Sequence, residues 1–316
     1  MAISSSRLAL ISGFLVLFYQ ATGLAAEGGY SNYIPGTYGD FAMAIEPPDR
    51  LTLRNDVYYY QADDQKSVRA GRIDLGAQLT FLVNLTTLLY KPDIQLDGAQ
   101  YAFGALIPLM KNEIESSLSF DPGDMGTKTR ATSDAAGLGD IVLVPWVFYW
   151  NADNLHANVS QFIVAPTGDY DETDPINTSL NYWSFDSNVA VTYLNPESGW
   201  EFSANLGYIY NTENSATDYQ TGEELHVDIA VNRYLSDSFA VGLHGFHLEQ
   251  ISGDSGDGAL LGNFEAQASG AGPAVLWSTR VAGRPISLIA KWLHEFDAER
   301  RIEGDHFIVS FALGFN

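Results

Sequence analysis

The sequence contains no cysteine and few basic residues, and each shortage excludes a class of function. Without cysteine among its 316 residues, the chain cannot have a disulfide framework, a thiolate metal site or a cysteine nucleophile. Its 16 Lys and Arg residues face 39 Asp and Glu residues, which gives a formal net charge of −23. Nucleic-acid phosphates require a basic surface, so we expect no nucleic-acid partner. The absence of cysteine also suits an exported protein.

Long hydrophobic runs are missing too, except near the N-terminus. Arg7 precedes an apolar run from Leu8 to Phe18, followed by small residues through Ala25 and Ala26. This is the tripartite pattern of a secretory signal, and the run is short for a membrane span of about 20 residues. We therefore expect residues 1–26 to be a signal peptide, cleaved after Ala25 or Ala26. A mature chain without spanning helices can enter a membrane only as a closed barrel, because lipid offers no partner to an open sheet edge.

Apolar and polar residues alternate along most of the remaining chain. In the last segment, Phe307, Val309 and Phe311 alternate with small or polar residues such as Ser310. Successive strand side chains point to opposite faces, so this pattern fits a lipid-facing barrel strand or a soluble edge strand. Alternating runs predict about twelve strands: residues 51–61, 71–90, 99–111, 140–150, 155–165, 182–194, 200–210, 223–234, 239–250, 264–281, 285–297 and 305–316.

The connections between these expected strands alternate in length. Long connections are expected at 62–70, 112–139, 166–181, 211–222, 251–263 and 298–304, and shorter ones at 91–98, 151–154, 195–199, 235–238 and 282–284. Outer-membrane barrels place short turns at the periplasmic side and longer loops outside. The sequence thus predicts an all-β fold, an antiparallel up-and-down barrel over residues 51–316. Its location would be the outer membrane of a Gram-negative bacterium, and its partners outer-membrane lipid and the barrel assembly machinery.

Several glycine-rich motifs make the chain resemble a known family. In chain order they are Gly36-Thr37-Tyr38-Gly39-Asp40-Phe41, Gly137-Leu138-Gly139-Asp140 with Pro145, Ala165-Pro166-Thr167-Gly168-Asp169-Tyr170-Asp171, Asn181-Tyr182-Trp183-Ser184-Phe185, Tyr219-Gln220-Thr221-Gly222 and Gly272-Pro273. With these motifs, nearly the whole mature chain resembles the outer-membrane proteins named after the meta-pathway of phenol degradation, which are regarded as transporter β-barrels. The resemblance implies passage of small, often aromatic or hydrophobic compounds. One departure is Asn316 after Phe315, since such barrels usually end on the aromatic residue.

Charged residues at alternate positions of the expected strands predict the lining of the lumen. If the apolar face of each strand meets lipid, as expected for Leu79 and Val83 in the second strand, the opposite face points inward. The predicted lumen-lining residues, on the substrate path, are Arg54, Asp56, Arg72, Asp74, Asp228, Lys291 and Glu295. Buried without water or mutual pairing, such charges would be costly. Either water fills the lumen or a salt-bridge network closes it.

The segment before the first strand, residues 27–50, is irregular but aromatic. Pro35, Gly36, Gly39, Pro47 and Pro48 break any regular element there. Its aromatic and aliphatic side chains need burial, and the nearest place is the lumen. We expect a lumen plug built on Tyr33, Tyr38 and Phe41; a clasp on the periplasmic rim is the alternative.

Residues that could perform catalysis or bind a metal form no convincing pattern. His226 and Asp228 could be an acid–base pair, but residues two apart on a strand share a face in any barrel wall, so we expect them to line the lumen. The acidic stretches 169–174 and 253–258 match no complete Ca²⁺ ligand pattern. We therefore expect no enzyme activity, cofactor or metal, and a channel for a small-molecule substrate. A structural or adhesive barrel with acidic surface loops is the alternative.

Overall fold

The computed structural model describes residues 26–29, 31–68, 73–120, 127–260, 262–281 and 283–315. The predicted signal residues 1–25 lie outside this range, as do Tyr30, Arg72 and Asn316. In the described part, the one helical turn η1 (Glu27–Gly29) precedes fourteen strands. No helix in this part is long and apolar enough to cross a membrane.

The strands follow one another along the chain with mostly short interruptions. They are β1 (Leu51–Val68), β2 (Ile73–Tyr90), β3 (Gln95–Leu96), β4 (Ala99–Phe120), β5 (Thr127–Leu138), β6 (Ile141–Ala152), β7 (Leu155–Ala165), β8 (Ser184–Asn195), β9 (Trp200–Asn211), β10 (Glu224–Ser236), β11 (Phe239–Gln250), β12 (Gln267–Val281), β13 (Arg284–Glu299) and β14 (Gly304–Phe315).

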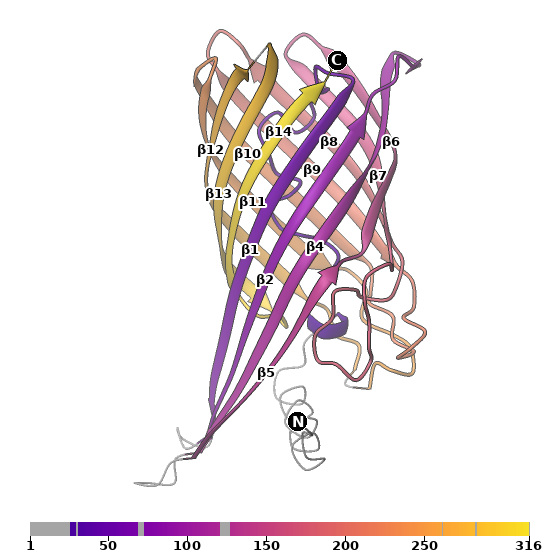
Figure 1. The fold of residues 1–316 in the computed structure, drawn as a ribbon, viewed down its shortest axis with the longest axis vertical. Coiled ribbons are helices and arrows are strands. Elements are labelled where there is room, and N and C mark those ends of the chain that lie inside the picture. The colour runs from indigo at the N-terminus through magenta and orange to yellow at the C-terminus, as the bar shows by residue number, and fades with distance from the viewer. Residues whose placement is uncertain are drawn as a thin grey trace.

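Antiparallel pairing closes these strands into a barrel (Figure 1). The seam joins the first and last strands, with β1 and β14 in register from Leu51–Phe315 to Ala62–Gly304. β5 and β6 pair with successive parts of β4 and together form one position in the wall. β3 has only two residues and pairs only with the start of β4. The wall therefore has twelve strands, as the alternation predicted.

Most strands face the way the sequence predicted. On β9, Phe202 and Leu206 are about half exposed, whereas Ser203 and Asn205 between them are buried. The same alternation occurs on β10 and β14. Inward-pointing polar residues and an outward belt of large apolar side chains, with Trp and Tyr near its edges, are the pattern of a barrel in lipid.

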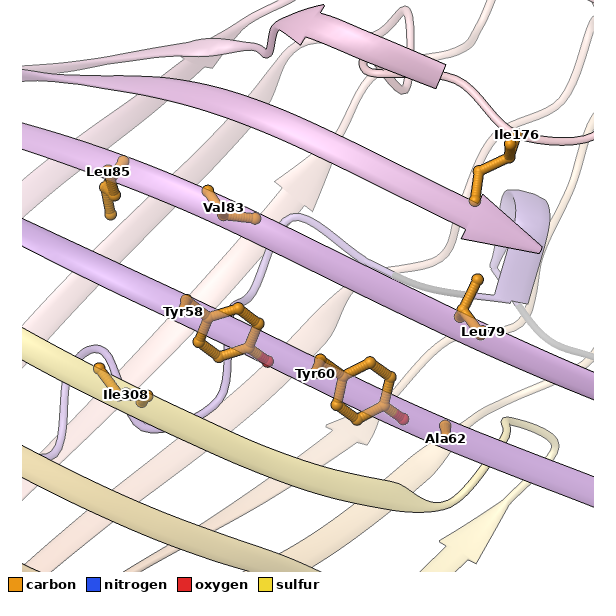
Figure 2. Close-up of a cluster of buried hydrophobic side chains, with 8 residues drawn as sticks. All are labelled: Tyr58, Tyr60, Ala62, Leu79, Val83, Leu85, Ile176 and Ile308. Carbon is orange, nitrogen blue, oxygen red and sulfur yellow. The ribbon is translucent and has the colours of Figure 1, made fainter. Parts of the chain in front are cut away.

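β2 is the exception, and the prediction for its faces was wrong. Leu79, Val83 and Leu85 are buried inside the barrel, whereas Leu82 and Leu88 are exposed. Both faces of this strand are apolar, because its inner face packs in an apolar cluster with Tyr58, Tyr60 and Ala62 of β1 and Ile308 of β14 (Figure 2). Because the lumen wall is apolar here, alternation alone cannot show which face of the strand meets lipid.

The two rims differ, and two of the predicted long loops are instead strand. The short-turn rim holds the start of β1, the end of β14 and the turns that follow β2, β6, β8, β10 and β12. The opposite, long-loop rim holds the connections 166–183, 212–223 and 251–266. There β1, β2, β4 and β5 continue well beyond the rest of the barrel (Figure 1). Most of 62–70 and 112–139 therefore forms paired strands. Although many side chains there are polar, the backbone N–H and C=O groups of facing residues still bond one another.

The N-terminal residues 26–29 and 31–50, here called the lumen segment, run through the inside of the barrel. The indigo trace is visible behind the wall strands in Figure 1. At one end, Ala26 contacts Asp254 in the connection 251–266 of the long-loop rim. At the other end, Lys91 Nζ donates to Glu46 Oε1 beside the short-turn rim. The segment thus spans the lumen from rim to rim.

Candidate functional site: the lumen segment and the cavity beside it

A charged cluster fixes the middle of the lumen segment. Asp40 lies between two cations from the wall, with Lys291 Nζ 3.3 Å from Oδ1 and Arg54 Nη1 2.5 Å from Oδ2. Lys291 also donates to the carbonyl oxygens of Gly36 and Gly39, at 2.9 and 2.6 Å. Gly36 has a φ of +80°, a conformation that glycine adopts without strain. The first family motif, 36–41, is thus the loop that wraps the Lys291 ammonium.

Arg54 connects this cluster to the β1–β14 seam. Its Nη2 atom lies 2.7 Å from Asp56 Oδ1 and donates to Ser310 Oγ at 3.0 Å. Ser310 in turn donates to Asp56. Because every charge has an opposite charge and hydrogen-bond partners, the group can be buried without the large cost of an isolated ion.

A second cluster holds Tyr33 and Tyr38 of the lumen segment. Tyr33 Oη donates to Asp228 Oδ1 at 2.9 Å, and Tyr38 Oη donates to Asp186. Both rings pack on the imidazole of His226, with centroids 4.4 and 4.7 Å away. That imidazole bridges the same two carboxylates, at 3.2 Å from each. His226 and Asp228 therefore hold the lumen segment.

A third set of contacts continues toward the short-turn rim. Glu201 Oε1 on β9 accepts a hydrogen bond from the Ala42 amide at 2.9 Å, and Thr192 Oγ1 on β8 accepts one from the Ala44 amide at 3.1 Å. Phe41 packs in an apolar cluster with Ala240, Ala274, Leu276 and Ile289 from β11, β12 and β13. The segment is therefore bound along its length by the inner faces of several strands.

The predicted lumen residues have different surroundings in this arrangement. Arg54, Asp56, Asp228, Lys291 and Glu295 all lie inside the barrel, four of them at most 4% exposed. They meet the lumen segment, the seam or, for Glu295, the connection 300–303. Arg72 and the side chain of Asp74 lie outside the described residues. Tyr33, Tyr38 and Phe41 are in the lumen.

A cavity of about 220 Å³ lies beside the lumen segment. Tyr33, Ile34 and Tyr38 form its inner side, and the apolar inner faces of β1, β2, β4 and β7 form its outer side. Figure 2 shows part of this wall, with Tyr58 and Tyr60 of β1 beside Val83 of β2. The lining is mostly apolar, so the cavity suits a nonpolar ring or chain.

A group of polar side chains lines the end of the cavity near the long-loop rim. Tyr58 Oη and His306 Nδ1 share a 2.6 Å hydrogen bond, and Tyr60 Oη donates to Glu295 Oε2 at 3.0 Å. Arg301 is largely buried there; its Nη2 lies 3.9 Å from Glu295 Oε1, and its Nε has no hydrogen-bond partner. A buried guanidinium N–H without a partner can donate to a ligand's oxygen.

The connection 166–183 folds over the same end of the cavity. Asp140, at the break between β5 and β6, organises it by accepting hydrogen bonds from the Thr167 and Gly168 amides through Oδ1. Oδ2 accepts from the Leu180 amide and from Ser179 Oγ, at 3.0 Å each. Two family motifs far apart in sequence, 137–140 and 165–171, thus meet at one carboxylate. The connection carries Ile176 toward Leu79 (Figure 2).

Sequence reasoning missed three members of the network that holds the lumen segment. Asp186, Glu201 and Asp40 supply hydrogen bonds or charges to the network. Each wall residue stands at an inward position of an alternating strand, which was the available signal. Arg301 stands in a connection, so alternation could not identify it.

Metal binding is not indicated by the residue clusters of the described part of the chain. No group of three or more His, Asp or Glu side chains in these residues is arranged to hold a metal ion. In the acidic stretch 169–174, Asp171 Oδ1 instead accepts from the Thr173 amide and hydroxyl, at 2.8 and 2.7 Å.

A closed twelve-stranded antiparallel barrel with an apolar outer belt defines an outer-membrane β-barrel protein. The protein lies in the outer membrane of a Gram-negative bacterium. It belongs to the family described as "Putative MetA-pathway of phenol degradation", whose model matches residues 59–311. The family resemblance that the motifs indicated is thereby confirmed.

One solved structure confirms the fold. The chain is similar to the COG4313 outer membrane channel of Pseudomonas putida F1, with a TM-score of 0.62 and 16% identity over 89% of this chain and 99% of that one. It also matches a Pseudomonas aeruginosa FadL homologue, with a TM-score of 0.42 and 7% identity over 93% and 96% of the two chains. A search of curated proteins finds no match.

Proposed function

We propose that this barrel is a channel for passive uptake of small, mostly apolar compounds, including aromatic ones, and that it is not an enzyme. The observation that carries the proposal is the cavity of about 220 Å³ between the lumen segment and the apolar inner faces of β1, β2 and β4. An apolar cavity of about 150 Å³ is large enough for benzene. A single-ring compound therefore fits this one.

The polar end of the cavity favours a ligand with an oxygen-bearing group at one end. The hydroxyls of Tyr58 and Tyr60 already have hydrogen-bond partners, whereas Arg301 Nε has none in the described part of the chain. A phenol or a benzoate placed with its ring among the β2 side chains could direct its oxygen toward Arg301. An Arg side chain is well suited to a carboxylate because it offers donors in a fixed fork.

The lumen segment serves as the gate in this proposal. It occupies the lumen from rim to rim, and its Tyr33 and Tyr38 form one wall of the cavity. A solute can cross the barrel only if part of this segment moves, or if the cavity opens to both rims alongside the segment. The buried charges of Asp40, Lys291 and Arg54 would keep the segment in place between passages.

A pair of matched substitutions on β2 tests the proposal. Val83 points into the cavity and Leu82, its neighbour, points outward and is 42% exposed. Val83→Phe should narrow the cavity, whereas Leu82→Phe should leave it unchanged. We expect Val83→Phe to weaken phenol binding about tenfold, which corresponds to about 1.4 kcal/mol, and to slow phenol uptake by porin-deficient cells.

Binding is measured by equilibrium dialysis of the purified protein against protein-free micelles, which corrects for partition of phenol into detergent. Heat-modifiable mobility on gels shows that each variant is a folded barrel. Equal binding by the Val83→Phe and Leu82→Phe variants would contradict the cavity as the site. If the unaltered protein neither binds nor admits phenol or benzoate, the structural or adhesive role is the better explanation.

A further inference from the structure

At the long-loop rim, the backbone nitrogen of Ala26 in the lumen segment contacts the buried carboxylate of Asp254. Ala26 is 4% exposed, and its nitrogen lies 3.0 Å from Oδ2 of Asp254, which is itself 3% exposed. Asp254 belongs to the connection 251–266 of the long-loop rim, and its own amide donates to Phe264 O at 3.2 Å. The contact therefore joins the start of the described chain to a fixed point on a loop.

Asp254 is surrounded by donors but has no cation. Besides Ala26, it accepts hydrogen bonds from Tyr219 Oη at 2.6 Å, the Gly222 amide at 3.1 Å and Gln250 Nε2 at 2.7 Å. Within the described part of the chain, no Lys, Arg or His side chain is within ion-pair distance of it. A buried carboxylate is costly unless an opposite charge compensates it.

The motif Tyr219-Gln220-Thr221-Gly222 builds this site. Tyr219 and Gly222 bind Asp254, and Gln220 exchanges two backbone hydrogen bonds with Ser255, at 2.8 and 2.9 Å. Thr221 Oγ1 accepts from the Glu27 amide at 3.3 Å. A side chain at position 222 would place its Cβ 1.8 Å from Ser252 O, so only glycine fits. All four residues thus position either the carboxylate or the segment that reaches it.

Glu27 brings a second carboxyl group close to Asp254, and a nearby positive charge would stabilise both. Burial raises the pKa of Glu27, and the negative charge of Asp254 adds to the effect. Glu27 is held by neutral donors, from Asn214 at 2.9 Å and Thr217 at 2.7 Å. A cation at the Ala26 nitrogen would offset the negative charge that the two carboxyl groups bring to this site.

The backbone at Ala26 indicates where that cation comes from. Its φ is +61°, a left-handed conformation that costs a residue with a side chain. Cutting the peptide bond before Ala26 would abolish this torsion. The sequence supports the same bond, because Gly23 and Ala25 are small at positions −3 and −1. Cleavage one residue later would put Leu24 at position −3.

We propose that a signal peptidase cleaves the chain between Ala25 and Ala26, and that the new α-ammonium of Ala26 is the counter-ion of Asp254. Water supplies the oxygen for the Ala25 carboxylate, and its two hydrogens, together with the amide hydrogen, complete the ammonium of Ala26. No other reactant is needed. A neutral amide hydrogen bond thereby becomes a buried ion pair, so the lumen segment is locked at the long-loop rim only in the processed protein.

The experiment uses the full precursor, expressed in a Gram-negative host and purified from the outer membrane. Intact mass and N-terminal sequencing should show a chain that begins at Ala26. Reductive methylation at pH 7, quantified on the N-terminal peptide by mass spectrometry, should label the α-amine slowly in the folded protein and rapidly after boiling in detergent.

Substitution of the carboxylate tests the ion pair. Asp254→Asn should raise the labelling rate about tenfold, since a hydrogen bond between charged groups is lost. Asp257→Asn is the matched control, because Asp257 is exposed in the same connection and should label as the unaltered protein does. Tyr219→Phe, which removes one hydrogen bond but keeps the charge, gives an intermediate rate and replaces Asp254→Asn if that variant does not assemble.

Two results would overturn the proposal. One is a mature chain that starts at Glu27 or at any residue other than Ala26. The other is an α-amine that reacts as fast in the folded protein as in the boiled one. Neither result depends on whether the barrel passes phenol.

Discussion

At the scale of single residues, Asp40 is the side chain on which the lumen segment depends most. It is the only carboxylate paired with Lys291 among the described residues, and it also meets Arg54. Removing one partner of a buried ion pair leaves an uncompensated charge, which costs about 3–5 kcal/mol. Asp40→Asn should therefore lower the free energy of unfolding by an amount of this order, measured by urea titration in detergent.

The double variant Asp40→Asn with Lys291→Met is the control for that prediction. It removes the orphaned ammonium, so it should be more stable than Asp40→Asn alone. A double-mutant cycle gives the coupling free energy between the two side chains. Additive effects would show that Asp40 and Lys291 do not act as a pair.

Alanine substitutions at Gly36 and Gly98 can separate the cost of a positive φ from the cost of a steric clash. Both have positive φ, +80° and +78°. A Cβ at Gly36 would lie 2.5 Å from Leu293 Cδ1, whereas a Cβ at Gly98 would meet nothing within 4 Å. Gly98→Ala should cost about 1–2 kcal/mol from conformation alone. Gly36→Ala should cost about 1–3 kcal/mol more, and equal losses in urea titrations would rule out the clash.

Single residues also show where sequence reasoning stops. Asp228 and Lys291 could be assigned to the lumen because they alternate with lipid-facing residues. Their partners, Tyr33 and Asp40, lie about 200 or more positions away in the chain, and no local pattern links them. Leu79 and Val83 were assigned to the wrong side because hydrophobicity marks burial in lipid and burial in an apolar lumen equally.

At the scale of strands, depth in the bilayer should decide the cost of a charge. Ile229 is exposed in the middle of β10, and Leu235 is exposed at the end of the same strand. Ile229→Arg should cost about 2–4 kcal/mol, as at the bilayer midplane, and Leu235→Arg about 0–1 kcal/mol, as near an interface. Folding into liposomes, monitored by gel mobility and urea titration, measures both. A larger loss of stability for Leu235→Arg than for Ile229→Arg would show that the lipid-facing apolar belt is not centred near Ile229.

Strand positions were predictable to within a few residues, but strand lengths at the long-loop rim were not. β7 and β11 have the predicted bounds. The hairpins β1–β2 and β4–β5 were expected to end in long loops, because residues such as Asn112, Ser116 and Thr132 are polar. Backbone pairing needs no apolar face once a strand has left the membrane, so composition there says little about whether the chain is paired.

At the scale of the whole molecule, the lumen segment should set the permeability. Deleting residues 30–45 behind an intact signal removes Tyr33, Tyr38, Asp40 and Phe41 and lets water reach the lumen charges. Single-channel conductance in planar bilayers should rise severalfold, and uptake of small solutes should rise with it. An assembled deletion variant with unchanged conductance would show that the lumen segment does not limit passage.

The seam between β1 and β14 implies an order of assembly. The lumen segment precedes β1 and spans both rims. Its charged and aromatic side chains meet β1, β8, β10 and β13, and its backbone amides meet β8 and β9. Drawing it through a finished barrel would strip each charge of water before its partner was reached. Wrapping the sheet around it brings the partners together as the last pairs form. We therefore expect the barrel to close around the lumen segment, which serves as its template and stays inside the finished barrel.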